Sequence, residues 1–108
     1  MTATAIEKVV SDHQKDYRYK TSASEPVERE GAQAFVLIEQ IDERHGGQFP
    51  DPQFRWSVWL MKPGEESFQR VHEDHAYESQ RSLYLRLQVE EGKLVAFDDR
   101  GEIVWQYS

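Results

Sequence analysis

The chain contains no cysteine, and this absence excludes disulfide bonds and thiolate metal ligands. No apolar run approaches the roughly 20 residues that a membrane-spanning helix needs. The first ten residues, MTATAIEKVV, lack the basic start and the long apolar run of a signal peptide. We therefore expect a cytoplasmic protein with no part in a membrane.

Positive charge is also scarce, because 13 Lys and Arg residues face 20 Asp and Glu residues and leave a net charge of −7. Much of the imbalance lies in residues 21–53, which hold two basic and seven acidic residues. Phosphate contacts dominate nucleic-acid affinity, so this balance argues against a nucleic-acid partner. It is compatible with a protein partner that has a basic surface, or with charge that simply keeps a small domain soluble.

The length of 108 residues fits a single domain, 1–108, with its own modest core. Aromatic residues are plentiful, with three Trp, five Tyr and five Phe, and this content argues against general disorder. The sequence shows no internal repeat and no low-complexity segment.

The last quarter of the chain, SLYLRLQVEEGKLVAFDDRGEIVWQYS, has the most regular pattern. Apolar and polar residues alternate with a period of two, which is typical of strands with one buried face. The alternation is interrupted at Glu91-Gly92 and again at 98–101, where glycine can supply the positive φ of a tight turn. We predict an antiparallel meander with strands at 82–90, 93–98 and 102–107.

Upstream, Thr4 and Glu7 match a capping box, and apolar residues at helical spacing predict an amphipathic helix from Ala5 to Tyr17 or Tyr19. Three further strands are expected at 34–42, 54–61 and 67–72. In the first two strands, both the odd-numbered and the even-numbered positions carry apolar residues, which indicates that both faces of each strand are covered.

These elements together predict an α+β fold. An N-terminal amphipathic helix packs on a five- or six-stranded antiparallel sheet that ends in the three-stranded meander. The alternative is a small, partly closed β-barrel with one helix.

The histidines of His72-Glu73-Asp74-His75 are the candidate metal ligands. On a helical turn, His72 and His75 would share a face and could bind a divalent ion with a carboxylate. On a strand, residues three apart point to opposite faces, and the pair could not act together. The alternative is a solvated polar corner, and we expect no cofactor.

Five residues are candidates for a binding surface: Phe49, Trp59, Tyr84, Arg86 and Phe97. Phe49 lies in the Gly- and Pro-rich loop 44–53 and is either a plug on the core or an anchor for a partner. Trp59 is either a core residue or part of an exposed patch. Tyr84 and Arg86 point outward from the meander, with Phe97 on the next strand, in a composition typical of protein interfaces.

The carboxylate pairs at 65–66, 90–91 and 98–99 fall at turns, and no catalytic constellation accompanies them. The first functional hypothesis is therefore a protein-binding module of adaptor, inhibitor or immunity type without catalytic activity. A second is a small-molecule- or metal-binding domain that uses a helix–sheet pocket lined by Trp56, Trp59 and Tyr17, or the His72/His75 corner. A third is a homo-oligomer in which a second copy covers the two-faced strands.

Overall fold

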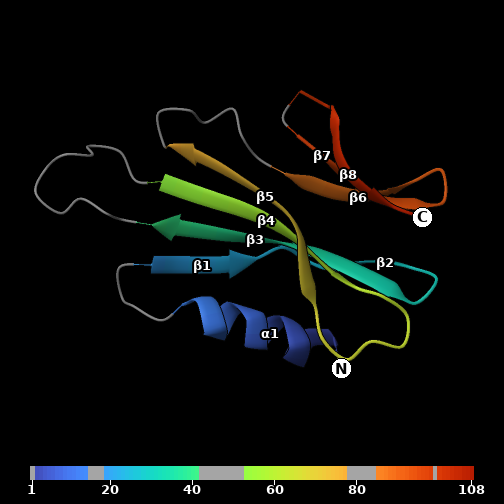
Figure 1. Cartoon of the computed structure of the whole chain (residues 1–108), viewed down its shortest axis with the longest axis horizontal. Coiled ribbons are helices and arrows are strands. Elements are labelled where there is room, and N and C mark those ends of the chain that lie inside the picture. Colours follow the sequence, from blue (N-terminus) through green and yellow to red (C-terminus); the bar gives the residue numbers. More distant parts are fainter. Residues whose placement is uncertain (1, 15–18, 42–52, 78–84, 99) are drawn as a thin grey trace, which may run out of the picture.

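The computed structural model describes residues 2–14, 19–41, 53–77, 85–98 and 100–108. Within these residues the chain forms one helix and eight strands, which pair into two antiparallel sheets (Figure 1). The elements are α1 (Thr2–His13), β1 (Tyr19–Ala23), β2 (Val27–Arg29), β3 (Ala32–Ile41), β4 (Gln53–Met61), β5 (Gln69–Tyr77), β6 (Arg86–Glu90), β7 (Lys93–Phe97) and β8 (Ile103–Tyr107). The prediction of one helix combined with antiparallel strands is confirmed.

The larger sheet, which we call the central sheet, has the order β1-β3-β4-β5, and β2 also pairs with β3. Its two faces have separate cores because successive residues of β3 point to opposite sides. Phe35 and Leu37 pack with Val9 of α1, whereas Ala34 and Val36 belong to clusters on the other face. The prediction that this strand is covered on both faces is confirmed.

The second face of the central sheet is covered by the meander β6-β7-β8, which forms a sheet of its own (Figure 1). Leu94 packs with Leu60 of β4, and Leu85 and Ala96 pack with Val58. The meander and its order were predicted, but a single sheet of five or six strands was wrong. One short helix covers only one face of a sheet, so the second apolar face requires a third layer.

Two hairpins close through two-residue turns with positive φ at both positions, as a type I′ turn requires. Glu30-Gly31 has φ of 49° and 86°, and Glu91-Gly92 has φ of 50° and 77°. The second turn is tied to the central sheet, because Arg29 Nε donates a hydrogen bond of 2.8 Å to the Gly92 carbonyl. This contact joins two hairpins that lie 63 residues apart in the chain.

Several element boundaries differ from the sequence prediction. The helix ends at His13, and Tyr19 already begins β1. Strand β5 continues to Tyr77, beyond the predicted end at residue 72, because it pairs with β4 as far as Gln53. Long-range pairing of this kind overrides a weak local preference. No helix among the described residues is long and apolar enough to cross a membrane.

Candidate functional site

The meander presents one of its faces away from the central sheet. Cross-strand pairing sets Arg86 opposite Phe97, Gln88 opposite Val95 and Glu90 opposite Lys93. On the other side of β7, Val95 faces Gln106 and Phe97 faces Ile103. We call this set the outer meander face: Arg86, Gln88, Glu90, Lys93, Val95, Phe97, Ile103 and Gln106.

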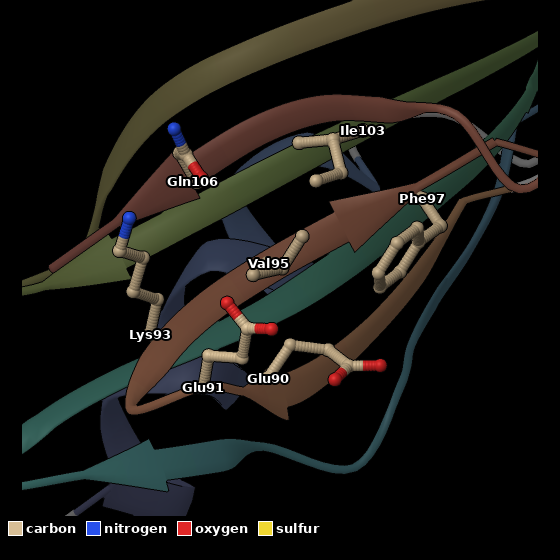
Figure 2. A pocket seen from close by; sticks show the side chains of 7 residues that line it. All are labelled: Glu90, Glu91, Lys93, Val95, Phe97, Ile103 and Gln106. Atoms are coloured by element: carbon tan, nitrogen blue, oxygen red, sulfur yellow. The ribbon is translucent and has the colours of Figure 1, made fainter.

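A hollow of about 300 Å³ lies on the outer meander face (Figure 2). Its lining comes from all three strands and the β6–β7 turn: Glu90, Glu91, Lys93, Val95, Phe97, Ile103 and Gln106. Val95 is only 2% exposed although it points away from the core, and it lies centrally among the lining side chains. Ile103 at the rim is 56% exposed. The hollow therefore has an apolar floor, and its rim combines the exposed Ile103 with charged and polar side chains.

Two carboxylates border the same hollow. Glu90 Oε1 accepts a hydrogen bond of 2.8 Å from Gln88 Nε2, which holds that carboxylate against the sheet. Glu91 is exposed and occupies the first position of the tight turn. Within the described part of the chain, neither Glu91 nor Lys93 forms a side-chain hydrogen bond or an ion pair. Their charges are therefore open to a partner.

Arg86 and Phe97, both predicted from the sequence as binding residues, lie together beside the hollow. The Arg86 guanidinium carbon is 5.7 Å from the centre of the Phe97 ring, within the range of a cation–π contact. On β8, Ile103 lies opposite Phe97, whereas Val104 packs toward the central sheet. The register between β7 and β8 is irregular between Ala96 and Phe97.

Trp59 lies elsewhere, on the helix-covered face of the central sheet. Its ring stacks on Phe35 with 6.3 Å between the ring centroids and forms a T-shaped pair with His13 at a centroid distance of 5.2 Å. Its Nε1 donates a hydrogen bond of 2.9 Å to Ser57 Oγ. This half-buried tryptophan is thus a packing residue that does not join Arg86 and Phe97. Phe49 and Tyr84 lie outside the described residues.

The helix–sheet pocket expected between Trp56 and Trp59 does not form, because the two residues pack in clusters on opposite faces of the central sheet. The third residue proposed for that pocket, Tyr17, lies outside the described residues. The pocket hypothesis is therefore wrong for the two tryptophans.

The metal hypothesis for His72 and His75 needs a helical turn, but both residues belong to β5. His72 pairs with Val58 and His75 with Arg55, so the two positions have opposite parity on the strand. His72 Nε2 is 2.6 Å from Asp74 Oδ2. Among the described residues, no group of three His, Cys, Asp or Glu side chains is arranged to hold a metal ion.

Sequence reasoning missed an ion pair between a buried carboxylate and a partly exposed arginine on the helix-covered face of the central sheet. Arg55 Nε and Nη2 donate to the two carboxylate oxygens of Glu39 at 2.9 and 2.8 Å, and Glu39 is only 3% exposed. These hydrogen bonds raise the pKa of Arg55, while burial acts in the opposite direction. The charged residues at 39 and 55 interrupt otherwise apolar strands, and this interruption was the available signal.

We compared the chain with known proteins. No protein-family model matches it, and neither a curated protein nor a solved structure does. The functional argument therefore rests on the residues themselves.

Proposed function

We propose that this protein is a non-enzymatic binding module that docks onto another protein through the outer meander face. The observation that carries the proposal is the hollow, in which the apolar residues Val95, Phe97 and Ile103 are surrounded by charged and polar side chains. Protein interfaces combine an apolar centre with a polar border in this way, and Arg and aromatic residues are enriched in them. Arg86 and Phe97 provide both residue types at the edge of the hollow.

The partner is a protein with a basic surface. The chain carries a net charge of −7, and long-range attraction between opposite charges increases the rate of association. A second copy of the chain is equally acidic and would be repelled. The two-faced strands that suggested self-association, β3 and β4, are covered within the chain by α1 and the meander.

The test is an affinity pull-down that compares wild type with Ile103→Lys. This substitution places a charge on the most exposed apolar side chain of the outer meander face. The matched control is Val71→Lys, because Val71 is 38% exposed and lies on β5 of the central sheet. Both variants should keep the wild-type melting temperature, since neither side chain is buried.

We expect a stoichiometric protein that wild type and Val71→Lys retain and Ile103→Lys loses. Higher salt should weaken its capture, because exposed charge pairs are screened. A partner that Ile103→Lys retains as well as wild type would show that the outer meander face is not the docking surface. Capture of no partner by wild type would count against the binding module itself.

A further inference from the structure

We infer that the hollow seats the side chain of a lysine or arginine from the basic partner. The inference rests on the proposed function and names the group that the outer meander face recognises. Its basis is the combination, within one hollow, of an apolar floor and two carboxylates (Figure 2).

The apolar part of the hollow suits the stem of a long cationic side chain. Val95 forms the floor, and Phe97 and Ile103 stand at its sides (Figure 2). Lysine and arginine bury their methylene groups along apolar surface while their charged ends stay in contact with polar groups. A hollow of about 300 Å³ has room for one such side chain.

The charged part of the hollow selects the end group. Glu90 and Glu91 lie side by side along one border, below Val95 in the view of Figure 2. An apolar side chain of the same length would take water from these carboxylates without replacing its hydrogen bonds, which is unfavourable. A carboxylate would be repelled, whereas an ammonium or guanidinium group forms charge-assisted hydrogen bonds with both.

Lys93 is a cation of this chain that lines the hollow and could compete for the site. It is the cross-strand partner of Glu90, yet it makes no ion pair in the described part of the structure. Figure 2 shows its side chain at the far side of the hollow from Phe97, directed away from the two carboxylates. The carboxylates therefore remain available, and Lys93 acts on an incoming cation only by repulsion. Removing its charge should strengthen binding of a cation and weaken binding of an anion.

The experiment is an NMR titration of the full chain with N-acetyl-arginine methylamide and N-acetyl-lysine methylamide. The neutral N-acetyl-norleucine methylamide serves as the control ligand. We expect the cationic probes to shift the amide resonances of Val95, Lys93 and Gln106 at millimolar concentrations. The neutral probe should cause markedly smaller shifts at the same concentrations.

Variants assign the interaction to the carboxylates. The double variant Glu90→Gln/Glu91→Gln should bind the cationic probes about fivefold more weakly, because two exposed charge pairs are lost. The matched control is Glu65→Gln/Glu66→Gln, which removes adjacent glutamates from the β4–β5 connection, outside the hollow. Lys93→Gln should bind them about twofold more tightly, since one repulsion is removed.

Three outcomes would overturn the inference: no shifts with either cationic probe, equal shifts with the neutral probe, or binding that Glu90→Gln/Glu91→Gln leaves unchanged. Each is distinct from failure of the proposed function, which the Ile103→Lys pull-down tests. If Ile103→Lys loses the partner but Glu90→Gln/Glu91→Gln retains it, the outer meander face remains the docking surface. The inferred lysine or arginine in the hollow would then be ruled out.

Discussion

Glu39 on the central sheet and Glu91 beside the hollow carry the same carboxylate in opposite settings. The Glu39 side chain is 5% exposed, and both of its oxygens accept hydrogen bonds from Arg55. Glu91 is exposed and forms no side-chain hydrogen bond or ion pair among the described residues. The Glu39 charge is paired within the fold, and the Glu91 charge has no partner among the described residues.

In a chain that is acidic overall, the two residues differ in whether the fold itself pairs the charge. A buried carboxylate must have its partner in place, because desolvation without compensation is costly. An exposed carboxylate has no such requirement, so its neighbours decide its use. At Glu91 the neighbours form the hollow, where the proposed docking of a partner would use the carboxylate.

The strongest test of the comparison is removal of the partner of Glu39. Arg55→Met should destabilise the fold by about 3–5 kcal/mol, because it leaves a buried carboxylate without its counter-charge. The free energy of unfolding can be measured by urea denaturation. The control is Glu39→Leu/Arg55→Met, which replaces both charges with apolar groups and should recover most of the loss. A loss of less than about 1 kcal/mol in the single variant would indicate that Glu39 behaves as an exposed charge.

A second test concerns the neutral polar groups of the same face. Ser57 is fully buried, and its Oγ accepts a hydrogen bond of 2.9 Å from the Trp59 indole N–H. Ser57→Ala should therefore cost about 1–3 kcal/mol, because the indole donor loses its acceptor. Denaturant melts of Ser57→Ala, Trp59→Phe and the double variant form a cycle. Strictly additive losses would show that this hydrogen bond contributes nothing.

A third test moves to the turn that carries Glu91. Gly92 and Gly101 have nearly equal φ, 77° and 79°, so alanine is strained at both by about 1 kcal/mol. At Gly92 a Cβ atom would also lie 2.9 Å from Arg29 Nη2, whereas at Gly101 no atom lies within 4 Å. Displacing Arg29 breaks its hydrogen bond to the turn. Gly92→Ala should therefore cost about 1 kcal/mol more than Gly101→Ala in thermal melts.

Repeating the Gly92→Ala comparison in an Arg29→Ala background should remove the difference between the two glycines. If the difference persists there, its cause is not the contact with Arg29.

The surroundings of Glu91 could be predicted from the sequence, whereas those of Glu39 could not. Period-two alternation and the glycine at position 92 predicted the meander and its turn, and the pairing of Arg86 with Phe97 follows from that turn. The pair between Glu39 and Arg55 depends on the register of β3 with β4, which no local pattern specifies. Because long-range pairing could not be predicted, Trp59 of the central sheet was grouped with Arg86 and Phe97 of the meander.

The most direct comparison makes the same substitution, glutamate to glutamine, at Glu91 and at Glu39. It also includes the smallest expected effect. Glu91→Gln should change the free energy of unfolding by less than about 0.5 kcal/mol, since an exposed carboxylate without a partner contributes little to stability. Glu39→Gln should cost about 1–3 kcal/mol, because it removes the charge that Arg55 hydrogen-bonds in a buried position. Both values come from the same denaturant series. Equal losses would mean that Glu91 has a structural role in the fold, and its charge could no longer be assigned to a partner.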